Sequence, residues 1–284
     1  MGRVTRRQRV VRIRNAAEVS ATDTLAVEEP LEIRLGGRPF QVTMRTPGED
    51  IDLVHGLLHS EQVIGEAGEV LLVRYCAGTG PDGANTYNVV DVTLRDDVTL
   101  PEDGLQRNVL TSSACGVCGT ASIDQLMKTA RHALSDTAVT SDVLLAAPRS
   151  VRAQQKVFAK TGGLHAAALL TLDGAVLCVR EDVGRHNAVD KVVGWALRQG
   201  RVPLTDTMLF VSGRASFELT QKAVLAGVGI LAAVSAPSSL AVELAEASGV
   251  TLVGFLRDDS MNVYSHPSRV RVGAPDLSGA AAVT

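Results

Sequence analysis

The most regular hydrophobic pattern of the chain lies in its C-terminal half, where short apolar runs alternate with segments of helical spacing. Apolar runs of this length predict buried strands, and apolar residues three or four positions apart predict helices. We expect strands at 207–211, 229–234 and 250–256, and helices at 216–226 and 238–248. Strands that are apolar throughout indicate a parallel sheet covered on both faces, so this half is predicted to be α/β.

A second apolar pattern lies just before this half. The segments 166–172 and 175–179 are apolar and flank Asp173-Gly174, which is a strong signal for a two-residue hairpin turn. A helix is expected next, with Asn187 and Asp190 as capping residues and its end at Gly200.

The N-terminal part shows the alternation of strands rather than the spacing of helices. Segments 31–35 and 40–44 alternate apolar and polar residues around Gly36-Gly37, which predicts a hairpin, and further strands are expected near 70–75 and 87–94. One helix is predicted to start after Pro47. We therefore expect a β-rich subdomain over 25–110 and an α/β domain over 111–272, with a basic, frayed tail at 1–24 and a disordered tail at 273–284.

Composition and charge narrow the class of protein. Apolar residues make up 45% of the 284 residues and charged residues 21%, which is the balance of a globular protein. The formal net charge of −3 gives no overall attraction to nucleic acid. No apolar run approaches the ~20 residues of a membrane span, and residues 1–7 lack the apolar core of a secretory signal. Four cysteines are too few for a disulfide scaffold, which favours a reducing cytoplasm.

The most reactive stretch of the sequence is Cys115-Gly116-Val117-Cys118, which lies among small, flexible residues. Ser122 and Gln125 form a capping-box pattern, and a helical apolar stripe follows. Both thiols are therefore expected just before a helix N-terminus, where the positive end of the helix dipole favours the thiolate. This predicts a nucleophilic sulfur on a mobile loop.

A Cys-x-x-Cys pair has several chemical interpretations. A structural zinc site needs two further ligands, which Cys76 and Cys178 do not supply as a second pair. His55 and His59, four residues apart, could form half of a zinc site, but we expect them to be exposed histidines instead. A zinc deaminase would carry an upstream His-x-Glu, which this chain lacks. Redox exchange and sulfur transfer remain equally compatible with the dithiol.

Three predicted loops carry arginine and follow strands of the α/β half, namely 181–187, 212–216 and 255–260. Open α/β sheets bind their ligands at the ends of strands. In the second of these loops, Gly213 and Ser216 would offer backbone N–H groups to a phosphate and Arg214 would add positive charge. An anionic ligand is therefore a hypothesis that the residues themselves support.

Long stretches of the chain resemble the formate dehydrogenase accessory sulfurtransferases, the FdhD family. The matching stretches are residues 28–31, 44–48, 113–119, 158, 161–167, 180–191, 212–219, 233–241 and 262–267. His55 and His59 depart from the apolar residues usual at those positions in the family.

The resemblance implies a function and a fold. Members of this family accept sulfur as a persulfide from a cysteine desulfurase and pass it to a molybdenum cofactor that carries two pterin guanine dinucleotides. The cofactor then enters formate dehydrogenase. The resemblance also implies a cytidine deaminase-like α/β domain without the zinc chemistry, and a homodimer.

The resemblance also assigns roles to residues of this chain. It implies that Cys115 carries the persulfide and that Cys118 assists. It further implies that the cofactor contacts the segment 255–260, and together with the anion-binding loops this gives a predicted set of cofactor-binding residues. That set is Phe255, Leu256, Arg257, Asp258, Asp259, Ser260, Gly213, Arg214, Ser216, Gly162, Gly163, His165, Arg185 and His186.

Two alternatives stay open. The protein could be a binding module that shelters and delivers the cofactor without sulfur chemistry, or a dithiol oxidoreductase. No resident metal or cofactor is predicted, because the molybdenum cofactor would be a transient ligand.

Overall fold

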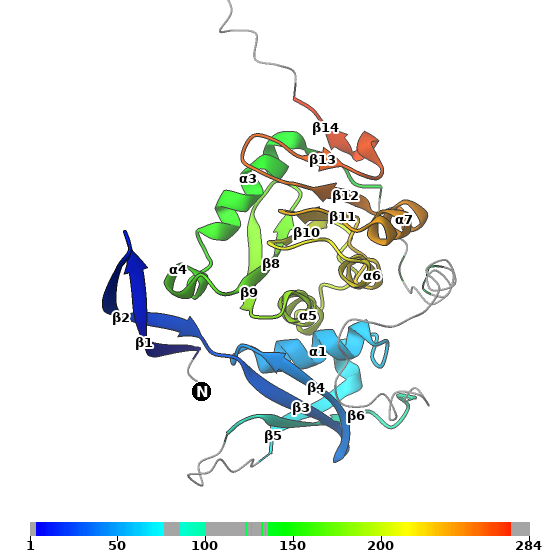
Figure 1. Ribbon diagram of the computed structural model, residues 1–284. Coiled ribbons are helices and arrows are strands. Elements are labelled where there is room, and N and C mark those ends of the chain that lie inside the picture. Colours follow the sequence, from blue (N-terminus) through cyan, green and yellow to red (C-terminus); the bar gives the residue numbers. More distant parts are fainter. Residues whose placement is uncertain are drawn as a thin grey trace, which may run out of the picture.

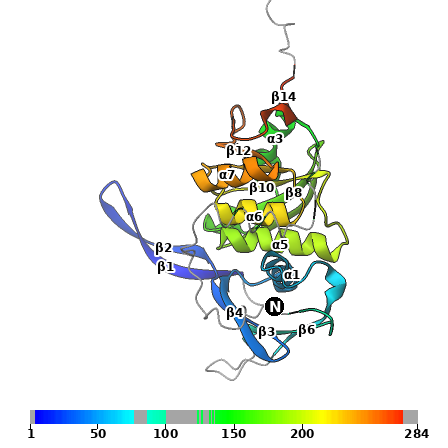
Figure 2. The same ribbon diagram turned by 90° about the vertical axis from the view of Figure 1, so that its right-hand side faces the viewer.

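The chain folds into stacked layers of sheet and helix (Figures 1 and 2). The structure, a computed structural model, describes residues 4–76, 86–99, 123, 126, 132, 134 and 136–273. A six-stranded sheet lies between α3 on one side and α5, α6 and α7 on the other, and α1 separates α5 from a four-stranded sheet (Figures 1 and 2). The predicted mixed α/β class is confirmed, whereas likeness to cytidine deaminase stays a prediction.

The six-stranded sheet has the order β13-β12-β11-β10-β8-β9. Its strands are β8 (His165–Thr171), β9 (Val176–Asp182), β10 (Thr207–Val211), β11 (Ile230–Ala233), β12 (Thr251–Gly254) and β13 (Asn262–Val263). The prediction of a parallel sheet holds for β10, β11 and β12 only, because β8, β9 and β13 join by antiparallel pairing. The hairpin at Asp173-Gly174 connects β8 to β9 as predicted, with Gly174 at a φ of 91°.

Alternate residues of the central strands serve two hydrophobic cores. Ala167 and Leu169 of β8 face the core shared with α5, α6 and α7, whereas Ala168 and Leu170 face the core shared with α3. Strands buried on both faces have no polar side, which explains their continuous apolar sequence.

The helices of the α/β domain are α3 (Ser141–Arg152), α4 (Phe158–Thr161), α5 (Arg185–Arg198), α6 (Phe217–Leu225) and α7 (Ser239–Ser248).

The β-rich subdomain forms a four-stranded sheet of order β4-β3-β6-β5 that packs on α1. Its elements are β3 (Glu29–Leu35), β4 (Arg38–Arg45), α1 (Asp50–Ser60), the 3-10 helix η1 (Ala67–Glu69), β5 (Val70–Tyr75) and β6 (Val89–Leu94). The four strands predicted here are therefore present. Near the C-terminal end of the described residues, β14 (Val270–Arg271) pairs with β7 (Val139–Thr140). The 3-10 helix η3 (Pro267–Arg269) directly precedes β14.

The predicted basic tail is instead a β-hairpin. Residues 1–3 lie outside the described part, and β1 (Thr5–Arg14) pairs antiparallel with β2 (Ala17–Ala26) in a ribbon that projects from the body (Figures 1 and 2). Asn15 and Ala16 form its turn, both with positive φ, at 49° and 59°. The sequence hides this hairpin because Asn-Ala is a weak turn signal and arginine interrupts the apolar alternation. The predicted disordered segment 274–284 lies outside the described residues.

Two helices from different parts of the chain approach each other through glycine. A Cβ added to Gly56 of α1 would lie 1.8 Å from the backbone oxygen of Asp190 in α5. A Cβ added to Gly194 of α5 would likewise lie 1.8 Å from the backbone oxygen of Asp52. Because only glycine permits such proximity, the sequence itself sets how closely the β-rich subdomain packs on the α/β domain.

Candidate functional site: one edge of the six-stranded sheet

Strand direction brings the predicted ligand loops to one edge of the six-stranded sheet. β10, β11 and β12 are parallel, and β9 runs in the same direction because both β9 and β10 are antiparallel to β8. The loops that follow these four strands therefore meet at one edge, and the segment that leads into β8 starts there. The loops predicted around Arg185, Arg214 and Arg257 are thus brought together, with Gly162 and His165 beside them.

His165 and Arg185 both lie close to Gly213 at this edge. A Cβ on Gly213 would lie 3.4 Å from His165 Nδ1 and 3.7 Å from Arg185 Cδ, so the loop backbone passes close to both side chains. Burial lowers the pKa of His165, and the positive charges of Arg185 and His186 lower it further. The Nε atom of Arg185 is buried, and no hydrogen-bond partner for it occurs within the described residues. This concentration of donors suits an anion.

His186 forms a hydrogen bond with Glu218 that the sequence analysis missed. Its Nε2 lies 2.8 Å from Glu218 Oε2 and 3.5 Å from Ser216 Oγ. The hydrogen bond to His186 lowers the pKa of Glu218, so the carboxylate stays ionised and orients the imidazole. The only signal for this role was a glutamate two positions after the capping serine.

The helices α5, α6 and α7 begin at this edge, because they follow β9, β10 and β11. α5 starts at Arg185 after Gly184, and α6 starts after Ser216, whose Oγ accepts a hydrogen bond from Leu219 N as a predicted N-cap. Helix N-termini present unpaired backbone N–H groups and a positive dipole end, which bind phosphate. Arg214 is exposed in the loop that leads into α6, where it is accessible to a ligand.

The predicted segment 255–260 is only partly available for contact. Phe255 has a positive φ of 50° and is 43% exposed, which leaves its ring free to stack on a planar group. Leu256 is fully buried in the core beneath the sheet, so its side chain does not face a ligand. Arg257 donates to the carbonyl of Val234, and Ser260 Oγ donates to Asp259 Oδ1 at 2.9 Å. Asp258 is exposed.

Gly162 and Gly163 follow α4 and lead into β8. Gly162 caps α4 with a φ of 66°, which requires glycine there. The carboxylate of Glu181 accepts hydrogen bonds from Val157 N at 2.9 Å and Phe158 N at 2.6 Å, so α4 is fixed to the end of β9.

Asp182, the last residue of β9, fixes the start of α5 at this edge. Its carboxylate is fully buried and lies 2.8 Å from Lys191 Nζ, which is also fully buried. It accepts hydrogen bonds from Thr46 N at 3.1 Å and Gly184 N at 2.8 Å. The start of α5 is therefore held to the β-rich subdomain by charge-assisted hydrogen bonds.

Asn187 and Asp190 do not cap α5, contrary to the prediction. Both lie inside that helix and are buried, where the helix packs on the β-rich subdomain. Asn187 Nδ2 donates to Met44 O at 2.7 Å, and Asp190 pairs with Lys222 at 2.7 Å. Their polar groups thus tie elements together instead of starting a helix.

The predicted sulfur-bearing residues, Cys115 and Cys118, lie outside the described residues, as do the capping residues Ser122 and Gln125. Cys178 is 5% exposed in β9, and burial raises the pKa of its thiol to about 12, which confirms the prediction of a structural cysteine. Cys76 is half-buried. Neither thiol is placed for chemistry at the edge.

The two histidines of α1 are buried, so the prediction of exposed side chains was wrong. His55 is 6% and His59 is 5% exposed, and His55 Nδ1 lies 2.8 Å from Ile51 O. They lie where α1 packs on the rest of the protein, which removes them from solvent. Within the part of the chain that the structure describes, no three His, Cys, Asp or Glu side chains converge as a metal site would require.

With this geometry in place, comparison with known proteins identifies the family. The sequence model of the FdhD/NarQ family matches residues 26–271. The chain belongs to the FdhD/NarQ family. The matched segment therefore includes the four-stranded sheet, the six-stranded sheet and the whole candidate edge. It excludes the projecting hairpin except for Ala26, the last residue of β2.

Relatives and a solved structure agree with this membership. The sulfur carrier protein FdhD of Nocardia farcinica is 61% identical over 272 residues, which cover 95% of this chain and 96% of that protein. The sulfur carrier protein FdhD of Streptomyces avermitilis is 57% identical over 282 residues, covering 98% of this chain and all of that protein. A crystal structure described as a formate dehydrogenase accessory protein from Desulfotalea psychrophila has the same fold, with a TM-score of 0.73, 24% identity, and coverage of 95% of this chain and 100% of that one.

The structure also bears on membrane insertion. None of the helices that it describes is long and apolar enough to cross a lipid bilayer.

Proposed function

We propose that this protein is a sulfur carrier that serves the maturation of formate dehydrogenase. Relatives that match it over nearly their whole length are named sulfur carrier proteins. The single structural observation that supports the proposal is the convergence of Arg185, His186 and the N-termini of α5 and α6 at one sheet edge. Such an edge suits the phosphates of the nucleotide-bearing molybdenum cofactor, which we propose as the transient ligand.

Cys115 is the proposed sulfur carrier. Its thiolate attacks the outer sulfur of a persulfide on a cysteine desulfurase, and the thiolate of that enzyme leaves, so Cys115 now carries the persulfide. Attack by the Cys118 thiolate on Cys115 Sγ then releases hydrosulfide toward the cofactor and leaves a disulfide, which a thiol reductant returns to two thiols. No metal chemistry of the protein itself is required.

The remaining residues of the edge would hold the ligand. Arg185, Arg214 and the N–H groups of α5 and α6 bind phosphate, and the exposed ring of Phe255 stacks on a planar base. The segment 255–260 takes part through its exposed residues, since Leu256 belongs to the core. A ligand with two nucleotide arms needs a long surface, which a homodimer would provide.

Mass spectrometry after incubation with a cysteine desulfurase and cysteine tests this proposal. We expect the intact protein to gain one sulfur atom, Cys115→Ala to gain none, and Cys76→Ala, as the matched control, to gain sulfur normally. If Cys115→Ala still activates formate dehydrogenase while Arg214→Ala does not, the protein is instead a binding module for the cofactor. If Cys118 is as essential as Cys115 and a disulfide cycles with thioredoxin, the protein is a dithiol oxidoreductase.

A further inference from the structure

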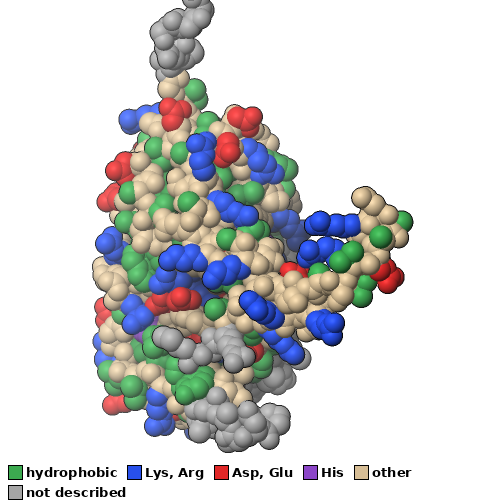
Figure 3. All heavy atoms as spheres, turned by 90° about the vertical axis from the view of Figure 1, so that its left-hand side faces the viewer, with side chains coloured by type: hydrophobic (Ala, Val, Ile, Leu, Met, Phe, Trp, Pro, Cys, Tyr) green, Lys and Arg blue, Asp and Glu red, His purple; other side chains and the backbone are tan. Residues whose placement is uncertain are grey.

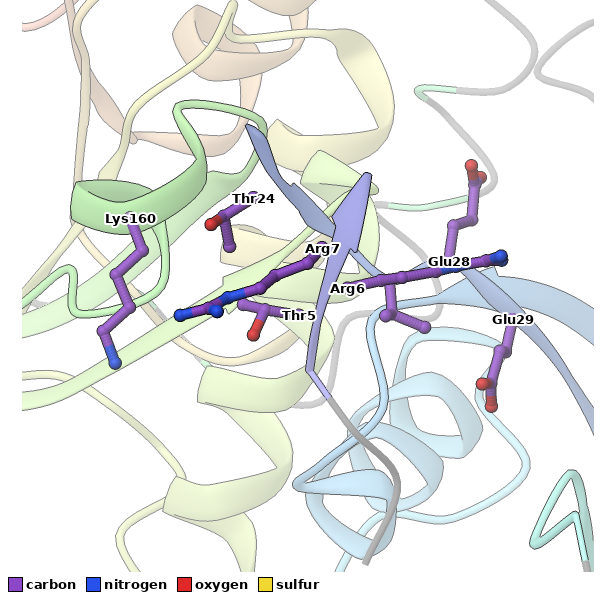
Figure 4. A pocket seen from close by; sticks show the side chains of 8 residues that line it. Thr5, Arg6, Arg7, Thr24, Glu28, Glu29 and Lys160 are labelled. Atoms are coloured by element: carbon purple, nitrogen blue, oxygen red, sulfur yellow. The ribbon is translucent and has the colours of Figure 1, made fainter. Parts of the chain in front are cut away.

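A groove lies between the projecting hairpin and the body of the molecule. It has a volume of about 950 Å³ and is lined by Thr5, Arg6, Arg7, Thr24, Val27, Glu28, Glu29 and Lys160. One wall is the base of the β1–β2 hairpin and the other includes α4 (Figure 4). Lys and Arg side chains gather around the base of the hairpin and on the neighbouring surface (Figure 3).

The strand register sorts these side chains into two groups. Arg7 pairs with Thr24 and Thr5 with Ala26, so Thr5, Arg7 and Thr24 share one face of the ribbon. Arg7 and Lys160 extend into the same half of the groove, with the two threonines beside them (Figure 4). Arg6 points to the opposite side, where Glu28 and Glu29 lie (Figure 4).

The cationic half of the groove has no internal counter-charge. Among the described residues, no carboxylate forms an ion pair with Arg7 or Lys160. The carboxylate of Glu29 instead forms an ion pair with Arg45, at 3.5 Å, in the half of the groove opposite Arg7 and Lys160 (Figure 4). Arg7 and Lys160 come from separate elements and present two positive charges to one space, so an anion between them would be attracted by both.

The hairpin itself needs an additional contact. A two-stranded ribbon is marginally stable alone, and residues 5–26 carry five arginines but only two acidic residues. Its base approaches Gly163, where a Cβ would lie 3.9 Å from Ala26 Cβ. An anion bound by Arg7 and Lys160 would join the ribbon to α4 at this point.

We propose that the groove binds a phosphate or pyrophosphate group, with Arg7 and Lys160 as charged ligands and the hydroxyls of Thr5 and Thr24 as further donors. This combination of guanidinium, ammonium and hydroxyl groups is the donor set that phosphate favours. The groove is separate from the candidate edge, although α4 and Gly162 connect the two. The proposal holds whether or not the edge binds a cofactor.

Calorimetric titration of the full chain with inorganic pyrophosphate, at constant ionic strength, tests the groove. Arg7→Gln and Lys160→Gln should each weaken binding about tenfold, as expected for loss of one charge-assisted hydrogen bond. Lys156→Gln and Arg12→Gln remove the same charge from exposed sites outside the groove, and they should leave the affinity unchanged. The proposal is overturned if wild-type protein binds no pyrophosphate at millimolar concentration, or if the control variants weaken binding as much.

Titration with GDP identifies the source of the phosphate. If the groove holds phosphates of a nucleotide that also occupies the edge, Arg7→Gln weakens GDP binding as well as pyrophosphate binding. If it holds a separate anion, Arg7→Gln weakens pyrophosphate binding and leaves GDP binding unchanged, whereas Arg185→Gln weakens GDP binding. Wild-type protein that binds pyrophosphate but not GDP would count against the proposed cofactor edge and not against the groove.

Discussion

Lys191 and Asp182 form an ion pair that solvent does not reach. Both side chains are fully buried, and 2.8 Å separates Lys191 Nζ from Asp182 Oδ2. Removing one partner leaves the other charge buried and uncompensated, which typically costs ~3–5 kcal/mol. We therefore expect Lys191→Met to lower the free energy of unfolding by about this amount, as measured by urea denaturation.

The double variant Lys191→Met/Asp182→Asn provides the control for this pair. It removes both charges, so it should recover part of the stability that the single variant loses. Lys156→Met removes an exposed ammonium group and should change stability little. A single variant as stable as wild type would show that the buried charge is not needed by the fold.

Two histidines give the protein a pH-dependent stability. Burial is the main cause that lowers the pKa of both His55 and His165 below the unfolded value of 6.5. As the pH falls, the unfolded chain therefore binds protons before the folded protein does, and the free energy of unfolding decreases below about pH 6.5. Urea denaturation at several pH values should show this loss, and it should be smaller in His55→Gln and His165→Gln. Equal pH slopes in wild type and both variants would contradict it.

At the scale of elements, the contact between α1 and α5 depends on two glycines. Ala at position 56 or 194 would place a methyl group 1.8 Å from a backbone oxygen, and backbone cannot yield as a side chain end does. Gly56→Ala and Gly194→Ala should each destabilise the protein by about 1–3 kcal/mol or more. Gly68→Ala is the control, since a Cβ there meets nothing within 4 Å. Thermal denaturation distinguishes these outcomes, and an unchanged Tm in both helix variants would contradict the prediction.

The elements that the sequence predicted well are those whose pattern reflects local physics. The expected strand at 207–211 coincides with β10, and the expected helix at 216–226 differs from α6 by one residue at each end. The apolar run that indicates the strand and the serine that caps the helix are local signals, which depend only on residues a few positions apart. The β1–β2 hairpin was missed because its stability does not come from an apolar face, and its turn at Asn15-Ala16 departs from the usual glycine signal.

Side-chain partners distant in sequence could not be predicted in the same way. The loops around Arg185, Arg214 and Arg257 were expected at one edge because strand ends in α/β sheets meet there. The pairing of His186 with Glu218, or of Asp182 with Lys191, depends on helix packing that no spacing rule specifies. Polar residues such as Asn187 fit capping rules equally well, so tertiary contacts decide their role.

At the scale of the whole molecule, the β-rich subdomain and the α/β domain are not independent units. Leu197 of α5 belongs to the hydrophobic core of the β-rich subdomain, and Asp52 of α1 forms ion pairs with Arg180 and Arg198 of the α/β domain. The close contact at Gly56 and Gly194 adds to these links. Separating the two parts would expose apolar side chains to water and leave charged side chains without their partners, so each part depends on the interface for its stability.

This coupling predicts that the two parts unfold in one transition. Trp195, the single tryptophan, lies on α5 and reports on the α/β core, whereas far-ultraviolet circular dichroism reports on both parts. Urea titrations followed by the two signals should coincide at one midpoint. Leu197→Ala, which removes an α5 side chain from the core of the β-rich subdomain, should shift both curves together by about 2–5 kcal/mol. Separate midpoints, or a variant that shifts only one curve, would show that the β-rich subdomain folds independently despite its ion pairs with α5 and β9.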